Sequence, residues 1–264
     1  MTAFDPAQLE RDLMVAAYAA KDIMLSPTSY GITAKGDHDY VTECDKAVQA
    51  VIINLITKSY PDAKFVAEEQ ENDNVEHSLE EGCFVIDPID GTHNFMNNIP
   101  FCAMSLAYVK SHEVLAGVVF APMLDEMFHA HIGGGAYLGD EKIECYQRDL
   151  SLGMLHAEDS WRALPALKEK MLGTRSLGSC ALAMCWTAAG RGAAYVGLPI
   201  LKIWDMAAGC LIAKEAGLEI FEADGTPYRL RFQGKNIVCR KEDIDDLVYV
   251  VRACEERYEK VALL

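Results

Sequence analysis

The sequence predicts a mixed α+β / α/β protein with an antiparallel first lobe and an α/β second lobe. In the first half, apolar residues recur at helical spacing over residues 6–25, and short apolar strands then follow one another across tight turns. Beyond about residue 145, strands and helices alternate, which is typical of an α/β layer. We therefore expect one domain over residues 1–264, with an α+β lobe at about 1–145 and an α/β lobe at about 146–264.

Two helices open the predicted first lobe. After the helix at residues 6–25, a second helix follows Thr42, which is a candidate N-cap because Asp45 stands three residues later, as in a capping box. This second helix ends near Pro61, and the polar segment 70–82 predicts a loop. The strands expected in this lobe cover residues 64–67, 83–86, 101–109, 114–120, 127–132 and 136–138.

The predicted second lobe begins where the pattern changes. One helix follows Gly178-Ser179, and another starts at Trp204 and ends before Gly217, a residue type that commonly terminates helices. We expect helices at residues 161–172, 180–189, 204–216 and 242–259, and strands at 193–196, 218–221 and 236–239.

The charge balance excludes several classes of partner. Lys plus Arg number 24 and Asp plus Glu number 40, which gives a net charge of −16 and disfavours binding to nucleic acid or to an anionic membrane surface. No apolar run approaches the ~20 residues of a membrane-spanning helix, and Met1–Leu13 lacks a signal-peptide pattern. Nine cysteines without a C-x-x-C pair favour a reducing compartment. We therefore expect a cytoplasmic protein.

The stretch Val85–Phe95 carries the clearest chemical signal. An apolar strand runs into Asp87 and Asp90, which are separated by a proline and an isoleucine and followed by Gly91 and Thr92. Two nearby carboxylates repel each other unless a cation joins them. A glycine at a helix start lets backbone amides approach a phosphate, although an ordinary Gly-Thr helix cap has the same sequence. The stretch predicts a metal site beside a phosphate site.

Further acidic residues stand where apolar elements begin or end. Asp45 lies early in a predicted helix, Glu68 follows a predicted strand, and Asp205 begins a predicted helix. Ligand sets rich in oxygen and free of thiolate suit hard cations, above all Mg²⁺. Asp45 and Asp205, taken singly, are better explained as helix caps, because Asp is a common capping residue.

The sequence resembles the inositol monophosphatase family of Mg²⁺-dependent, lithium-sensitive phosphatases over nearly its whole length. The resemblance rests on three motifs in order, Ala67-Glu68-Glu69, Asp87 to Phe95, and Trp204 to Gly209 followed by Glu215-Ala216-Gly217. It implies a layered α-β-α-β-α sandwich of the inositol monophosphatase and fructose-1,6-bisphosphatase type. It also implies two or three Mg²⁺ ions per active site and, because the family often forms dimers, a possible homodimer.

The resemblance also implies a role for individual residues. Glu68, Asp87 and the Ile89 carbonyl would hold a first metal; Asp87, Asp90 and Asp205 would hold a second, and Glu68 with waters a weaker third. Gly91 and Thr92 would contact phosphate, and Thr92 with Asp45 and the metal near Glu68 would activate the attacking water. Asp90, Gly178, Ser179, Cys180 and Asp205 would lie against the phosphate or the substrate hydroxyls.

Some positions depart from the family pattern. Leu198 stands where inositol enzymes commonly have a glutamate that receives inositol hydroxyls, and His93 stands where they usually have threonine. The segment after Lys35 is one residue shorter than usual. His129 and His131 alternate in a predicted strand and are interpreted as strand surface residues, with metal binding as the alternative.

We expect a Mg²⁺-dependent phosphomonoesterase that hydrolyses inositol monophosphate or a related small polyol or sugar phosphate by in-line attack of water. Fructose-1,6-bisphosphatase and 3′-phosphonucleotide phosphatase activities are alternatives within the same superfamily. A catalytically silent metal-binding protein is an alternative of a different class.

Overall fold

The computed structural model describes residues 4–26, 32–36, 39–145, 154–157, 173–249 and 251–252. Side chains are described over these ranges except at residues 32–36, 39–42, 154–157 and 198–200, where the backbone alone is described. The predicted helix at residues 161–172 and the end of the predicted final helix, 253–259, lie outside the described residues.

The larger sheet has seven strands in the order β3-β4-β5-β6-β7-β8-β9. All neighbours are antiparallel except β3 and β4, which are parallel. The expectation of a wholly antiparallel first sheet is therefore wrong at one edge. The bounds are Phe65–Ala67 (β3), Cys83–Asp90 (β4), Ala103–Lys110 (β5), Glu113–Ala121 (β6), Glu126–His131 (β7), Gly135–Leu138 (β8) and Glu141–Ile143 (β9).

The parallel pair requires a crossover, because neighbouring parallel strands cannot be joined by a tight turn. Helix α3 (Val75–Glu81) provides it, so the prediction of a simple polar loop at residues 70–82 is wrong. Strand β4 also runs four residues past the predicted end, which places Asp87 and Asp90 inside the strand and not after it.

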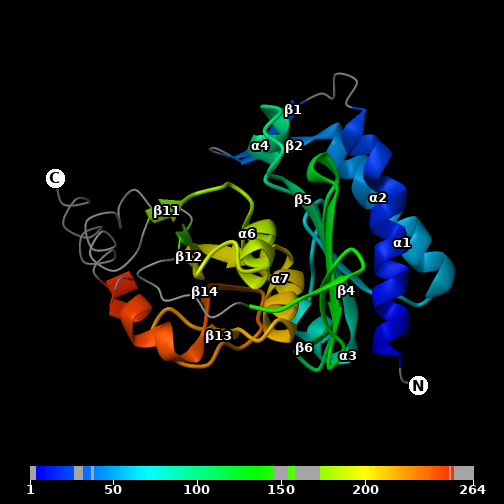
Figure 1. Cartoon of the computed structure of the whole chain (residues 1–264). Helices are drawn as coiled ribbons and strands as arrows, with labels where there is room; N and C mark the ends of the chain where they lie inside the picture. Colours follow the sequence, from blue (N-terminus) through cyan, green and yellow to red (C-terminus); the bar gives the residue numbers. More distant parts are fainter. Residues whose placement is uncertain are drawn as a thin grey trace.

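Helices cover both faces of this sheet (Figure 1). Helices α1 (Pro6–Leu25) and α2 (Glu43–Ser59) pack on one face, and α6 (Cys180–Ala188) and α7 (Ile203–Glu215) pack on the other. Successive side chains of β4 point to opposite faces of the sheet, and both faces are covered. Phe84 and Ile86 belong to the α1/α2 core, and Val85 belongs to the α6/α7 core.

A second sheet lies beyond α6 and α7, with five strands in the order β11-β10-β12-β14-β13. Tyr195 and Val238 of this sheet pack in the α6/α7 core, whereas Phe221 and Ile237 pack with Leu247 of a helical segment described at residues 244–249 and 251–252. The bounds are Met154–Ala157 (β10), Gly173–Arg175 (β11), Ala194–Lys202 (β12), Glu219–Phe221 (β13) and Gln233–Cys239 (β14). A short β1–β2 ribbon, Ile32–Gly36 and Asp39–Thr42, precedes α2.

The layers therefore run α, β, α, β, α, from α1 and α2 at the right of Figure 1 to the orange-red helix at the left. This confirms the predicted layered sandwich. The division into two lobes at about residue 145 stays a prediction. Within the described ranges, we find no helix with the length and apolar character needed to cross a bilayer.

Candidate metal and phosphate site

A bulge in β4 brings the two aspartates of the central motif together. Asp87 pairs with Ser105 of β5, but Asp90 pairs with Ala103, so three steps along β4 oppose two steps along β5. In a regular strand, residues three apart point to opposite faces, and the extra residue of a bulge removes this alternation. The bulge therefore allows Asp87 and Asp90 to share one side of the strand.

Asp205 joins these two residues from the first turn of α7. Ser105 Oγ donates a hydrogen bond of 2.8 Å to the Trp204 carbonyl, which fixes the start of α7 against β5 beside Asp87. The Lys202 amide donates to Asp205 Oδ2 at 2.7 Å, so Asp205 also caps its own helix. One carboxylate oxygen from each of Asp87, Asp90 and Asp205 lies within 4.8 Å of the others, the one such three-ligand group among the described residues.

Asp87, Asp90 and Asp205 form a group that we name the aspartate cluster. The burial and mutual repulsion of its carboxylates favour a bound cation. Asp87 and Asp90 are 2% and 7% exposed. Burial raises the pKa of Asp87 and of Asp205 well above the usual range, and the neighbouring acids, Glu68 for Asp87 and Asp90 for Asp205, raise each pKa further. A divalent cation between the carboxylates would remove this repulsion, and an all-oxygen donor set suits a hard ion. The cluster thus fits a metal site.

Glu68 and Ile89 adjoin the aspartate cluster. The Glu68 amide donates to the Ile86 carbonyl at 3.1 Å where β3 ends, and the Glu68 side chain is hydrogen-bonded with Asp87. The Ile89 amide donates to Asp87 Oδ1 at 2.9 Å, so the backbone of the bulge holds the Asp87 carboxylate in place. These residues are two further predicted metal ligands, and the fold brings both to Asp87.

Thr92 and Asp45 meet on the α2 side of the bulge. Thr92 Oγ1 lies 3.0 Å from the Ile89 carbonyl and 3.3 Å from Asp45 Oδ1. Asp45, in the first turn of α2, is fully buried. Thr92 begins the five-residue helix α4 (Thr92–Met96), and Gly91 precedes it with φ of 91°. Phosphate contact by Gly91 and Thr92 stays a prediction.

The segment Gly178-Ser179-Cys180 lies against Asp90. Ser179 is fully buried and donates through Oγ to Asp90 Oδ2 at 2.5 Å, while the Cys180 amide donates to Asp90 Oδ1 at 3.2 Å. Gly178 has φ of 81°, and a Cβ there would lie 2.8 Å from Asn94 Nδ2. The structure thus brings all three residues to the aspartate cluster, whereas contact with a substrate stays a prediction.

Asn94 is a structural residue of this site to which the sequence assigned no role. Its side-chain amide donates to the Phe101 carbonyl at 2.7 Å and to the Leu177 carbonyl at 2.6 Å, tying the two halves of the site together. The sequence showed Asn94 only as part of a motif, and the two carbonyls it joins are far apart along the chain.

Other predicted positions lie outside the site or outside the described side chains. The side chains of Lys35 and Leu198 are not among those described, and His93 is exposed on α4. His129 and His131 are partly buried, with side chains 11% and 26% exposed, because α1 covers them: their Nδ1 atoms lie 2.6 and 2.5 Å from the two carboxylate oxygens of Glu10.

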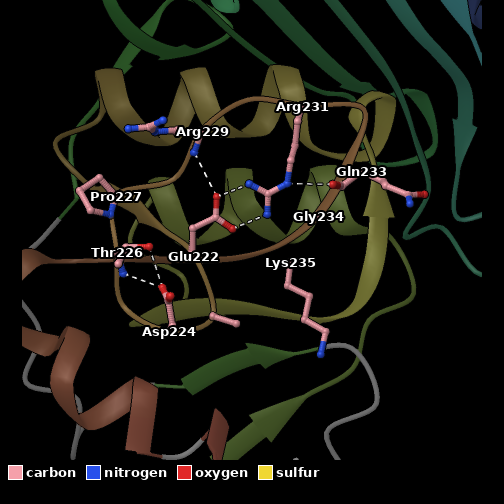
Figure 2. Close-up of a pocket in the computed structure, with 10 residues that line it drawn as sticks. Glu222, Asp224, Thr226, Pro227, Arg229, Arg231, Gln233, Gly234 and Lys235 are labelled. Atoms are coloured by element: carbon pink, nitrogen blue, oxygen red, sulfur yellow. Dashed lines mark hydrogen bonds and ion pairs between the residues drawn. The ribbon is translucent and has the colours of Figure 1, made fainter. Parts of the chain in front are cut away.

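A cavity of about 880 Å³ lies elsewhere, beside β13 and β14 (Figure 2). Arg231, one of the cations that line it, donates to both carboxylate oxygens of Glu222 at 2.6 Å and to the Gln233 carbonyl at 3.1 Å. The charge of Arg231 is therefore balanced by Glu222. Of the described residues that line this cavity, none is a predicted ligand.

Comparisons with known proteins identify the family of this chain. The model of the "Inositol monophosphatase family" matches residues 8–256. Nus factor SuhB of Vibrio cholerae is 38% identical over 218 residues, which cover 78% of this chain and 79% of that protein. Inositol monophosphatase 1 of Solanum lycopersicum is 33% identical over 215 residues, covering 76% and 79%. The solved IMPase of Thermotoga maritima is 28% identical with a TM-score of 0.85, covering 95% of this chain and 98% of that one. The chain therefore belongs to the inositol monophosphatase family and is a phosphoric monoester hydrolase.

Proposed function

We propose that this protein is a Mg²⁺-dependent phosphomonoesterase that hydrolyses inositol monophosphate or a related small polyol or sugar phosphate. The observation that carries the proposal is the aspartate cluster, in which three carboxylates from β4 and α7 approach within 4.8 Å in a chain of this family. A solved IMPase/NADP phosphatase with the same fold and 20% identity is described as complexed with Mg²⁺ and phosphate. That description concerns the other protein, and it motivates Mg²⁺ as the first ion to test.

The residues for two or three ions are all present near Asp87. Asp87 with Glu68 and the Ile89 carbonyl would hold one ion, Asp87 with Asp90 and Asp205 a second, and Glu68 a weaker third. When bound, Mg²⁺ supplies positive charge that stabilises the phosphoryl oxygens and the leaving oxygen of the reaction. Each carboxylate of the aspartate cluster is fixed by backbone or side-chain donors, so the ligand geometry is largely formed beforehand.

Thr92 and Asp45 would orient and deprotonate the attacking water. The Thr92 hydroxyl has one hydrogen and faces two acceptors, the Ile89 carbonyl and Asp45 Oδ1, so its oxygen lone pairs are left to accept a hydrogen bond from a water. Asp45 would take the proton as the water oxygen attacks phosphorus and the bond to the alcohol oxygen breaks on the opposite side. No covalent enzyme intermediate is required. The amides at Gly91 and Thr92 would hold the phosphate oxygens.

The substrate alternatives differ in what surrounds the phosphate. Inositol and sugar phosphates need hydroxyl acceptors, and Leu198 lacks the carboxylate that inositol enzymes commonly have at this place. A 3′-phosphonucleotide would need room and a stacking surface for adenine. We rank inositol monophosphate first because curated relatives of 32–33% identity from plants and bacteria are named as inositol monophosphatases.

The test is phosphate release from inositol 1-phosphate, fructose 1,6-bisphosphate and adenosine 3′,5′-bisphosphate. We expect the highest rate with inositol 1-phosphate, complete loss of release in EDTA, recovery with added Mg²⁺, and inhibition by lithium. Lithium enters because a solved staphylococcal relative of 20% identity is described as a LiCl-soaked inhibitory complex. Release that survives EDTA would reject the metal mechanism. Mg²⁺ binding without release from any of the three substrates would favour the silent metal-binding alternative.

A further inference from the structure

The Ser179 side chain is buried between the aspartate cluster and helix α6. It is 0% exposed and forms the N-cap of α6, where its oxygen accepts from the Leu182 amide at 3.4 Å. Its hydroxyl hydrogen is directed to Asp90 Oδ2, 2.5 Å away. A hydroxyl has a single hydrogen to donate, so this one is already used inside the protein.

Asp90 in turn serves as a second cap for α6, although it comes from β4. Its Oδ2 also accepts from the Ala181 amide at 2.7 Å, and its Oδ1 accepts from the Cys180 amide at 3.2 Å. The first amides of a helix have no partners within the helix, and a carboxylate is a favourable acceptor for them. Three donors from three consecutive positions thus fix the rotation of the Asp90 carboxylate. Ser179 is the one of the three that a substitution can remove.

The segment that carries Ser179 is held in place by other contacts. A Cβ at Gly91 would lie 2.8 Å from the Gly178 carbonyl oxygen and 3.3 Å from Ser179 Cβ, so the two backbones pack closely. The Asn94 side-chain amide donates to the Leu177 carbonyl, just before this segment, and to the Phe101 carbonyl, so it links the segment to the residues after α4. Loss of the Ser179 hydroxyl therefore leaves the α6 start in position and removes one of the three donors that orient the Asp90 carboxylate.

We infer that Ser179 is a positioning residue, which orients Asp90 for metal binding and does not touch the substrate with its hydroxyl. The inference rests on the proposed metal-dependent function and assigns a role within it. The family resemblance suggests the opposite role, contact with substrate hydroxyls. The two roles differ in what they affect: orientation of Asp90 acts on every phosphate ester, whereas a contact with substrate hydroxyls acts on polyol substrates alone.

The experiment removes the hydroxyl with Ser179→Ala and, separately, with Ser179→Gly, since glycine is tolerated at an N-cap better than alanine. Thr187→Val is the matched control, because Thr187 is also buried on α6 and its hydroxyl donates to the Ala183 carbonyl, away from Asp90. Mg²⁺ binding is measured by calorimetry without substrate. Turnover is measured on inositol 1-phosphate and on phenyl phosphate, which has no hydroxyl group.

We expect the Mg²⁺ affinity of both Ser179 variants to fall by about 10-fold, the lower end of the range for residues that orient metal ligands, because two backbone donors to Asp90 remain. Turnover should fall by a similar factor on both substrates at sub-saturating Mg²⁺, and Thr187→Val should match the wild type. Mg²⁺ affinity within twofold of wild type in both variants would overturn the inference. So would a rise in KM confined to inositol 1-phosphate. If wild type binds Mg²⁺ and releases no phosphate, the proposed function fails while calorimetry still decides the role of Ser179.

Discussion

Asp87→Asn should make the protein more stable in EDTA. The stability of this variant should also no longer depend on Mg²⁺. Asparagine keeps the oxygen that accepts from the Ile89 amide, so the local structure of the bulge is preserved. The substitution removes one of three carboxylates that repel each other when no cation lies between them. The Asp87 carboxylate therefore destabilises the metal-free protein and is expected to stabilise the metal-bound one.

The size of the effect follows from the geometry and from the proton equilibrium. At 4.8 Å, the repulsion between two ionised carboxylates is about 3.5 kcal/mol at an effective dielectric constant of about 20, and Asp87 faces two such neighbours. Protonation limits this cost, because a proton held at pH 7 on a group of ordinary pKa 3.8 costs about 4 kcal/mol. Removing the Asp87 carboxylate removes this cost, and burying the new amide offsets part of the gain. We therefore expect a gain in unfolding free energy of about 2 kcal/mol, or about 5 °C in Tm.

The pH dependence has a definite sign. Burial and neighbouring acids raise the pKa of Asp87 in the folded protein, so the folded state holds a proton that the unfolded state releases. In EDTA, the wild type should therefore lose stability as pH rises from about 4 through the raised pKa, and Asp87→Asn should show a shallower decline.

The assay is thermal and urea unfolding in EDTA and in Mg²⁺, with Asp125→Asn as the control. Asp125 is exposed and has φ of 54°, a conformation that asparagine accepts readily. We expect Mg²⁺ to raise the Tm of wild type and of Asp125→Asn, and to leave Asp87→Asn unchanged. An Asp87→Asn variant that is less stable than wild type in EDTA, or that Mg²⁺ stabilises normally, would refute this reasoning.

Three further predictions follow from the contacts around the site and from α1. Asp205→Asn keeps an acceptor for the Lys202 amide and should stay folded, but phosphate release should fall by about 100-fold or more; near-normal release would remove Asp205 from the ligand set. Asn94→Ala leaves two carbonyls without their donor and should lower the unfolding free energy by about 2 kcal/mol in urea, against a small effect for Asn97→Ala, whose amide donates to a carbonyl at the exposed surface; equal losses would contradict the bridging role. Hydrogen bonds to Glu10 and to the Gly139 carbonyl raise the pKa of His129 despite its burial, so its stabilisation is complete below pH ~6.5 and lost as pH rises through the raised pKa. His129→Gln should therefore cost about 1 kcal/mol at pH 6 and little at pH 9 by urea unfolding, and a loss independent of pH would contradict the ion pair.

Local patterns in the sequence were sufficient to predict many of the helices and strands, whereas the order of the layers was implied by the family resemblance. The apolar run at residues 83–86 and the helical spacing over residues 6–25 each indicate which side chains are buried, and α1 has the predicted bounds. The pair Asp87 and Asp90 was also predicted as a metal site from its own motif, because two nearby carboxylates repel each other unless a cation joins them. Asp205 lies more than a hundred residues after Asp87 in the sequence, and only the family resemblance placed the two together.

Contacts between distant segments could not be predicted in this way. Nothing in the spacing of Ser179 indicates that its hydroxyl faces Asp90, because this depends on how α6 packs against the bulge. Glu10 likewise meets His129 and His131 across 119 and 121 positions, so the two histidines read as surface residues until α1 is placed over them. The bulge in β4 and the parallel edge strand β3 arise from register, which hydrophobic alternation alone leaves open.

The most direct test of the central claim is anomalous diffraction from crystals of the protein grown with Mn²⁺, which takes the same oxygen ligands as Mg²⁺. We predict at least one anomalous peak between the carboxylates of Asp87, Asp90 and Asp205, with a second peak near Glu68. Crystals at a Mn²⁺ concentration that supports phosphate release, but with no peak among these three aspartates, would contradict the account.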